Sequence, residues 1–399
     1  MSIPNVQVLM GFRTGAGGTV VMTDVTTYVQ AVTTNRGRSR QLQQFNAGSA
    51  SVQLWNKSRA FDPLNTASPY WNTFANVTSI TPRIPIQILS SSIAIFTGVI
   101  TDWNIDYDLG NNDIAVATCS DDFTVLANNE LAAHTTTEQL SSARVSTVLG
   151  YSEVAYTGTT SISTGSSTLG GTAANAGFSI ADGTVVLNYL QSIAVSEQGF
   201  LFMSASGVLT FKGRTSVLNK PAGANFTGDG TGIPFNSLEN EYGDELLYNL
   251  ISTQSPAGVE QTTSSAESIA LYQTQTYTEN GLLNSTTAQV ADLGKYLLGK
   301  YKFPVLRFKS LSTQVMALSN TNRDICLNLE LTSVCNVTKN FQQGSPSSST
   351  QPLIVSGIAH QITPSNHVIQ YTFESADRNQ YLTLSDLTFG RLDYNLLAF

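Results

Sequence analysis

The sequence predicts a mainly β protein with a few helices, and three observations lead to this prediction. Most apolar segments are short and alternate with polar residues, as the run Ala50-Ser51-Val52-Gln53-Leu54 does, which is typical of a half-buried strand. Turns rich in glycine, proline and asparagine separate these segments. Only a few stretches show the spacing of an amphipathic helix. A chain of 399 residues is also longer than one hydrophobic core usually serves, so we expect two to three domains.

The composition is polar but weakly charged. Charged residues make up 12% of the chain, and the formal net charge is -8. Binding to nucleic acid through phosphate neutralisation needs clustered lysine and arginine, whereas the basic residues here are scattered. We therefore expect no specific nucleic-acid binding. Such a surface suits a protein whose neighbours cover much of it, or an extracellular protein.

The cysteines and the apolar runs exclude several classes of protein. Cys119, Cys326 and Cys335 form no paired spacing, so we expect free buried thiols, with no disulfide framework, zinc site or other cofactor. No apolar run approaches the roughly 20 residues of a membrane helix, so we expect no transmembrane segment. Residues 1–5 lack the basic and apolar stretches of a secretory signal, so we expect synthesis in a cytoplasm.

The first elements of the chain are two strands and a turn. Apolar residues dominate Val6 to Phe12 and Thr19 to Asp24, on either side of the loop Gly15-Ala16-Gly17-Gly18. A glycine-rich loop also suggests a phosphate cradle, but no Gly-Lys-Ser/Thr follows it, so we interpret it as a hairpin tip. Asn35-Arg36-Gly37-Arg38 then predicts a turn.

The segment from Asn56 to Trp103 combines a loop with two strands. Phe61-Asp62-Pro63-Leu64-Asn65, followed by Ser68-Pro69-Tyr70, predicts a loop that its prolines hold in place. Strands follow from Ile84 to Ile88 and from Ile93 to Trp103, and the second passes through Gly98.

Together these pieces resemble the N-terminal signature of bacteriophage minor tail proteins of the tail-hub type. That signature joins an Arg-Gly-Arg turn, a strand, an Asn-x-x-Arg-x-Phe-Asp-Pro-x-Asn loop, a Ser-Pro-Tyr and a Phe-x-Gly-x-Ile/Val-x-x-Trp strand. The last stretch, Phe389-Gly390-Arg391-Leu392-Asp393, is similar to the usual ending of the same family. The residues that carry the resemblance are Arg36, Gly37, Arg38, Asp62, Pro63, Asn65, Pro69, Tyr70, Gly98, Trp103, Gly390 and Asp393.

Helices and further strands follow Trp103. Ser120-Asp121-Asp122 predicts the N-cap of a short helix from Phe123 to Ala133. Asp182 predicts the cap of an amphipathic helix that runs to Ala194. A hairpin of two short apolar strands between residues 200 and 211 comes next, and a later helix spans residues 287–301.

Two distant segments share one plan. From Phe96 to Phe123 and from Leu353 to Asp377, a strand through a glycine leads to a turn, an alternating strand and an acidic end. The glycines are Gly98 and Gly357. Because strand-turn-strand units are common, chance stays open as an explanation of this echo.

The family resemblance gives the echo a meaning. It implies β-barrel-like hub domains at residues 1–133 and 236–399, the second with the helix 287–301, and an inserted α/β domain at residues 134–235. It also implies a homotrimer that presents six like units in a ring. The implied partners are the tail tube or distal tail protein, the tape measure protein and receptor-binding tail proteins, and the implied location is the tip of a virion tail.

The implied function is that of a structural hub. Such a protein closes or lines the end of the tail tube, anchors receptor-binding proteins and lets DNA pass on infection. A host-surface-binding tail-tip protein and a tail-associated cell-wall hydrolase are the alternatives. Glu197 has no second carboxylate at a defined spacing, and His360 and His367 have no evident third metal ligand. We therefore expect no catalytic, metal or cofactor site.

Overall fold

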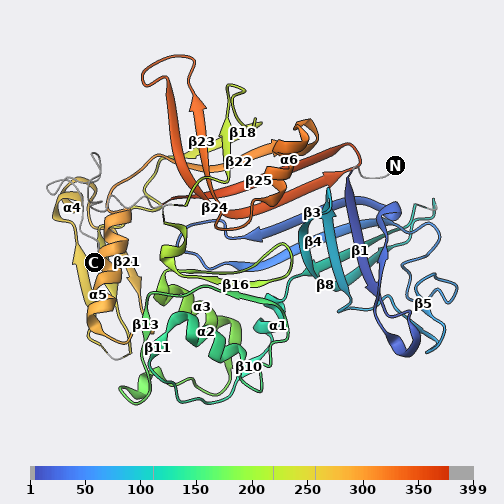
Figure 1. Cartoon of the computed structure of the whole chain (residues 1–399), viewed down its shortest axis with the longest axis horizontal. Helices are drawn as coiled ribbons and strands as arrows, with labels where there is room; N and C mark the ends of the chain where they lie inside the picture. Colours follow the sequence, from blue (N-terminus) through green and yellow to red (C-terminus); the bar gives the residue numbers. More distant parts are fainter. Residues whose placement is uncertain (1–4, 111, 219, 257, 377–399) are drawn as a thin grey trace.

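The computed structural model describes residues 5–110, 112–218, 220–256 and 258–376 (Figure 1). The fold is mainly β with a few helices, so the predicted class is confirmed. One large sheet runs through the molecule and joins strands from both ends of the described chain. In spatial order its strands are β18 (Ser237–Glu241), β22 (Arg307–Gln314), β25 (Asn366–Ser375), β24 (Ser348–Thr363), β3 (Val29–Gly37), β4 (Asn46–Trp55), β9 (Ile114–Ser120), β8 (Ile93–Asp106), β7 (Pro85–Ser90), β1 (Val6–Phe12) and β2 (Val21–Asp24).

A side branch extends this sheet at β24. The first half of β24 pairs with β23 (Val334–Asn340), which in turn pairs in parallel with β17 (Ala224–Thr227). The second half of β24 pairs with β3 instead. The hairpin of β23 and β24 projects from the body at the top of Figure 1.

The sheet contains two units with the same topology. In the N-terminal unit the spatial order is β3, β4, β9, β8, and in the C-terminal unit it is β18, β22, β25, β24, with all neighbours antiparallel. Chain order matches as well, since the last two strands of each unit form a hairpin. The predicted echo between the two hairpins therefore extends to four strands.

The bulges of the two hairpins give the register of the echo. The pairing of β8 with β9 shifts between Ile100 and Asp102, and that of β24 with β25 shifts between Val355 and Gly357. Aligned on these bulges, Gly98 precedes the shift whereas Gly357 follows it. The two glycines that suggested the echo are therefore not equivalent positions, although the strands around them are.

Helices and small sheets cover one side of the large sheet (Figure 1). α2 (Ser141–Leu149) and α3 (Val186–Glu197) pack on each other, and α1 (Phe123–Ala127) contacts α3. A small sheet of β12 (Thr160–Ile162), β16 (Leu209–Lys212) and β15 (Phe200–Met203) lies beside them. Phe45 connects this layer to the sheet, because its ring lies 5.7 Å from that of Phe202.

A separate small module lies at the left of Figure 1. It contains the sheet β20 (Gln261–Ser264), β19 (Leu250–Thr253), β21 (Thr276–Glu279), together with α4 (Ala266–Tyr272) and α5 (Thr287–Tyr301). A second apolar cluster, distinct from the main core, holds it together through Ile251, Leu282, Val290, Leu293, Leu297 and Tyr301. The predicted bounds of the helix 287–301 are confirmed.

The remaining β-strands and α-helix of the described chain are short. They are β5 (Trp71–Asn72), β6 (Val77–Thr78), β10 (Glu130–Leu131), β11 (Gln139–Leu140), β13 (Thr168–Leu169), β14 (Thr184–Val185) and α6 (Asn320–Asn328). β17 falls in the segment predicted as the inserted domain yet pairs in the large sheet. The three domain boundaries stay predictions.

Two predicted helix starts or ends are wrong. The helix at Phe123 ends at Ala127, because Asn128 and Asn129 favour a turn over a helix interior and Glu130 already pairs in β10. The helix predicted from Asp182 begins only at Val186, since Gly183 has φ +79° and Thr184 pairs in β14. Asp182 therefore does not cap it.

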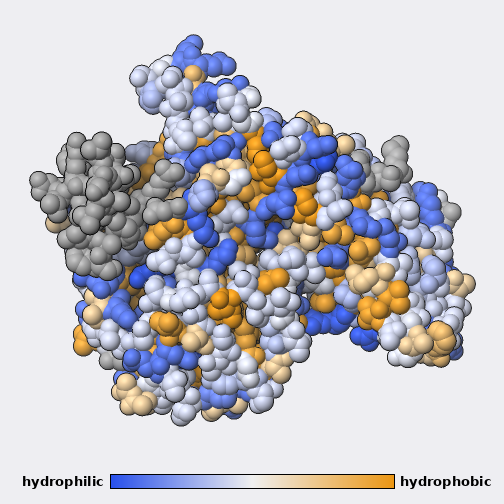
Figure 2. Space-filling model, viewed as in Figure 1, coloured by the Kyte–Doolittle hydropathy of each residue, from blue (hydrophilic) through white to orange (hydrophobic). Residues whose placement is uncertain are grey.

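Polar residues dominate much of the visible surface (Figure 2). The tip of the projecting hairpin consists of exposed residues of this kind, Gln342 to Ser347. Among the described helices, none has the length and apolar character needed to cross a membrane.

Gly98 is a position where the fold excludes a side chain, so Gly98→Ala tests the packing of β8. An added Cβ would lie 2.3 Å from the Ser120 carbonyl oxygen, which is backbone and cannot move aside. For Gly98→Ala we expect a loss of about 1–3 kcal/mol in the free energy of unfolding, measured by urea denaturation. For the larger change Gly98→Trp we expect assembly to fail. The matched control is Gly299→Ala in α5, where a Cβ meets nothing within 4 Å. Wild-type stability of Gly98→Ala would contradict the expectation.

Candidate functional site

The candidate site is the joint where β3 of the N-terminal unit meets β24 of the C-terminal unit. Gly37 lies opposite Gly357, and four residues further along β24, Gln361 lies opposite Thr33. Gly37 has φ +107°, and a Cβ there would lie 2.2 Å from the Ser356 carbonyl oxygen. Only glycine permits this approach of two backbones. The turn predicted at residues 35–38 is wrong, because β3 continues through Gly37.

Arg36 connects the joint to two other parts of the chain. Its side chain is buried, and Nη1 donates to Glu330 Oε1 at 2.7 Å and to the Met203 carbonyl oxygen at 3.4 Å. Glu330 also accepts from the backbone N–H of Ala205 at 2.7 Å. A buried guanidinium requires such partners, because an unpaired buried charge is strongly destabilising. The contact holds the layer under the sheet in register with the joint.

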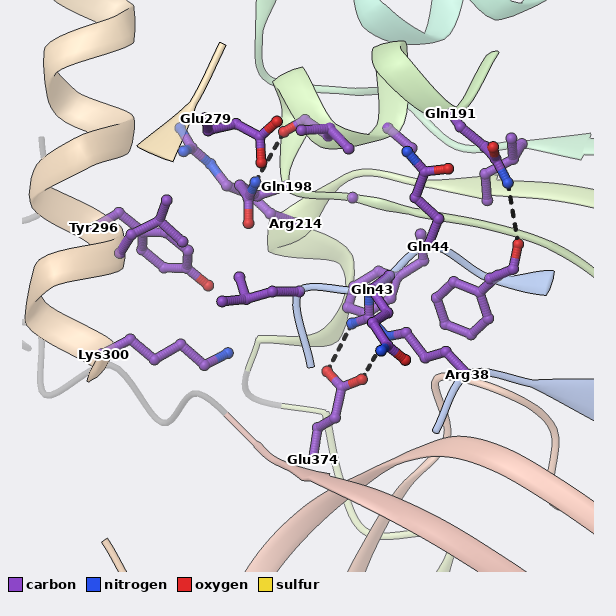
Figure 3. Close-up of a pocket in the computed structure, with 18 of the residues that line it drawn as sticks. Arg38, Gln43, Gln44, Gln191, Gln198, Arg214, Glu279, Tyr296, Lys300 and Glu374 are labelled. Carbon is purple, nitrogen blue, oxygen red and sulfur yellow. Dashed lines mark hydrogen bonds and ion pairs between the residues drawn. The ribbon is translucent and has the colours of Figure 1, made fainter. Parts of the chain in front are cut away.

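Arg38 makes the second ion pair of the joint, with Glu374 at the end of β25. Its Nε and Nη2 atoms donate to the two carboxylate oxygens at 2.5 and 2.7 Å, and Nη1 donates to the Gln43 carbonyl oxygen. Figure 3 shows the two side chains facing each other at the rim of a pocket. The guanidinium carbon lies 4.7 Å from the centre of the Phe45 ring. Such a fork-to-fork pair fixes the direction of both side chains.

The pocket beside this pair lies between the sheet, α3 and the small module. Its polar lining includes Arg214, Gln198 and Glu279. Burial raises the pKa of Glu279, although the Tyr277 hydroxyl donates to its carboxylate at 2.6 Å. The other carboxylate of the lining, Glu374, is held by the two hydrogen bonds from Arg38.

The loop of residues 56–70 is closed by hydrogen bonds from its own polar side chains. Asp62 is buried, accepts from Leu64 N–H at 2.8 Å and pairs with Arg59. Burial opposes its negative charge, but these bonds outweigh the effect, so the pKa of Asp62 is lowered. Asn65 donates to the Arg59 carbonyl oxygen, and Ser68 donates to that of Ala60. Pro63 and Pro69 lie in the turns of this loop.

Aromatic rings anchor the loop to the N-terminal unit. The Tyr70 ring stacks on that of Phe12 at 3.9 Å, and the Phe61 ring stacks on that of Trp103 at 6.0 Å. Trp103 Nε1 donates to the Thr81 carbonyl oxygen. The predicted loop residues and Trp103 therefore meet in one cluster, which lies in the N-terminal unit and not at the joint.

Glu197 ends α3 and has a connecting role. Its buried carboxylate accepts from the hydroxyls of Ser141 and Ser166 and from the backbone N–H groups of Ser166 and Ser167. Burial disfavours the charge, but these four donors lower the pKa of Glu197. Glu197 therefore connects the end of α3 to neighbouring segments of the chain, because every one of these donors belongs to such a segment.

His360 and His367 face each other across the hairpin of β24 and β25. His360 Nδ1 and His367 Nε2 are 3.0 Å apart, and both rings are buried. Within the described residues, no group of three or more histidine, cysteine, aspartate or glutamate side chains could hold a metal ion. Burial lowers the pKa of His367 to about 4 and that of His360 well below its usual value, helped by the nearby His367 and Arg36.

Three solved structures with a similar fold are tail proteins. The tail protein from Neisseria meningitidis matches with a TM-score of 0.60 at 10% identity, over 93% of this chain and 96% of that one. The 43 kDa tail protein of prophage MuSo2 from Shewanella oneidensis matches with a TM-score of 0.55 at 12% identity, over 93% and 98%. The chain has the fold of a phage tail protein. A prophage tail protein, gp18 from Listeria monocytogenes, is also similar, with a TM-score of 0.51 at 8% identity, over 93% and 95%.

Neither a protein-family model nor a curated protein sequence matches the chain. The tail-protein fold is therefore retained at sequence identities where few individual residues are shared. The resemblance to phage tail proteins predicted from the sequence is confirmed at the level of the fold.

The tail-protein fold brings some of the predicted residues together and separates others. Arg36, Gly37, Arg38 and Gly357 meet at the joint. Gly98 lies in the strand that leads to the loop cluster, away from the joint. Gly390 and Asp393 lie outside the described residues. Sequence reasoning missed Glu330 and identified Glu374 only as part of an acidic end, because the two lie 294 and 336 positions from their arginines.

The Arg38–Glu374 pair is tested by Arg38→Met. Glu374 would remain buried without a partner, which costs about 3–5 kcal/mol of unfolding free energy. Arg38→Met with Glu374→Gln removes both charges, so we expect it to be more stable than Arg38→Met alone by at least about 1 kcal/mol in urea denaturation. Additive losses in the double variant would show that the two groups are not coupled.

The histidine pair predicts a loss of stability in mild acid. Between pH 6.5 and about 4, His367 is protonated in the unfolded chain but stays neutral in the folded protein, because its pKa there is about 4. The free energy of unfolding therefore falls as the pH falls, by about 1.4 kcal/mol per pH unit. Burial raises the pKa of Asp121 to about 7, which gives the opposite slope. The measurement is therefore the difference between wild type and His367→Gln at each pH, and equal slopes would refute the prediction.

Proposed function

We propose that the chain is a structural protein of a phage tail, acting as the hub at the tail tip in the form of a homotrimer. The observation that supports this proposal best is the pair of matched four-stranded units joined edge to edge in one sheet. Three chains then supply six like units. Such a ring matches a threefold tip to a sixfold tail tube.

The proposed mechanism is mechanical. The ring closes or lines the end of the tail tube and opens for DNA on infection. The net charge of -8 suits a channel that does not retain DNA, because phosphates are not attracted to it. The buried ion pairs of Arg36 and Arg38 support a rigid joint between units, and the proposal assigns the chain no catalytic step.

The proposed neighbours follow from this place in the particle. The tail tube or distal tail protein and the tape measure protein contact the ring on one side, and receptor-binding tail proteins attach around it. The projecting hairpin of β23 and β24 offers a polar arm for one of these contacts. We assign residues 1–133 and 236–399 to the two hub domains and residues 134–235 to the inserted domain.

Light scattering after size-exclusion chromatography tests the homotrimer. We expect three copies, about three times the 42.8 kDa of one chain. Six copies would move the assignment to a distal-tail ring. Gold-labelled antibodies against the chain should then mark the tail tip of the particle in electron micrographs, and label along the whole tail would contradict the hub.

A further inference from the structure

Of the strand edges of the large sheet that have no described strand beside them, two belong to the two matched units. The sheet ends at β18, which pairs with β22 alone. On the other edge of the N-terminal unit, β7 covers β8 only as far as Val99, and Ile84 and Arg83 extend the contact to Ile100. Beyond it, residues 102–106 of β8 pair with β9 on one side and with no described strand on the other. Unpaired strand edges are templates for another strand.

The internal echo relates these two edges to the joint. The row Trp103, Ala117, Val52, Val32 crosses the N-terminal unit from β8 to β3, and the row Ile358, Tyr371, Leu311, Leu238 crosses the C-terminal unit from β24 to β18. Both rows start two residues after the bulge of their hairpin. β18 is therefore the counterpart of β3, and residues 102–106 of β8 are the counterpart of the half of β24 that β3 covers.

We propose that β18 of one chain pairs antiparallel with residues 102–106 of β8 in a second copy of this chain, in the register of the intrachain joint. This inference rests on the proposed homotrimer and names the surfaces that form it. Within the chain Arg36 lies opposite Ile358 and Val32 opposite Ile362. In the two rows, Val32 corresponds to Leu238 and Ile358 to Trp103, so the same register can be applied to the contact between copies. It places Tyr242 opposite Trp103 of the second copy and Leu238 opposite its Tyr107.

The exposed side chains of the two edges fit this register. Tyr242 is 69% exposed and Tyr107 is 56% exposed, although both are large and aromatic. In the proposed pairing, Tyr242 lies opposite Trp103 and Tyr107 lies opposite Leu238. Asn240 lies opposite Ile105 on the same face of the sheet. This face continues the main core, because Trp103, Ile105 and Leu238 already pack against it. Aromatic cross-strand pairs of this kind stabilise sheets.

The glycine of the joint also has a counterpart. Gly243 follows Tyr242 as Gly37 follows Arg36, and an added Cβ at Gly243 meets nothing within 4 Å in the single chain. The opposite face carries one unfavourable pair, Glu239 opposite Asp106. Lys309 reduces this repulsion, since its Nζ lies 3.6 Å from Glu239 and 4.0 Å from Glu241.

We take the partner to be a second copy because the two edges do not pair with each other within the described residues of one chain. Six strands separate β18 from β8 in the sheet. Each copy thus offers one edge of each kind, a head-to-tail contact that closes into a ring. Three such contacts and three intrachain joints alternate around the proposed ring of six units.

Disulfide cross-linking tests the register. Glu241 and Asn104 lie opposite each other across the proposed contact, where Cβ atoms are about 4.5–5.5 Å apart, near the span of a disulfide. We expect oxidised Glu241→Cys/Asn104→Cys to run as a covalent trimer on non-reducing gels. The three native cysteines are buried. Asn240→Cys/Asn104→Cys is the matched control, because its side chains point to opposite faces and should stay unlinked.

Tyr242→Ala provides a second measurement without cysteines. We expect the concentration at which the trimer dissociates to rise about tenfold or more, with unchanged unfolding of the single chain. Phe74→Ala, at a 73% exposed ring on another loop, should leave the trimer unchanged. A trimer that forms without the Glu241–Asn104 cross-link, or that tolerates Tyr242→Ala, overturns this strand pairing and leaves the trimer standing. A monomer at every concentration overturns both.

Discussion

The close approach of two backbones at Gly37 and Gly357 is the constraint on which the sheet depends. A carbonyl oxygen occupies the place that any Cβ at Gly37 would need, so β3 and β24 can lie side by side only through glycine. The ion pairs of Arg36 and Arg38 flank this contact and fix its direction. The two halves of the chain, far apart in sequence, thereby form one sheet and not two separate ones.

Local patterns in the sequence predicted the elements whose causes are local. The hairpin of β1 and β2, the helix 287–301 and the hairpin of β15 and β16 follow from periodicity and turn residues within a few positions. Arg36-Gly37-Arg38 predicts a turn although the strand continues through it. A glycine between polar residues gives the same local pattern in a turn and in a strand that lies very close to another backbone. The partners of this segment, Glu330 and Ser356, are some three hundred positions away.

The repeated unit could be recognised from the sequence only in part. The two hairpins share an alternation of apolar and polar residues and an acidic end, and both features can be seen in the local sequence. Their first and second strands, β3 with β18 and β4 with β22, share little beyond an apolar residue at the matching rows, Val32 with Leu238 and Val52 with Leu311. The bulges at Thr101 and Ser356 relate the two units better than the glycines do, and a bulge leaves no fixed sequence signal.

The strand β24 pairs with β23 before its bulge and with β3 after it, and this change of neighbour has a mechanical consequence. The strand runs without interruption from the tip of the projecting hairpin, past β23, to the joint with β3. A force that pulls on the hairpin tip therefore acts along β24 and loads the hydrogen bonds to β3 and β25 in shear, many at once. Bonds loaded together resist far more force than bonds peeled one by one, so the arm can transmit a pull to the centre of the sheet without opening it.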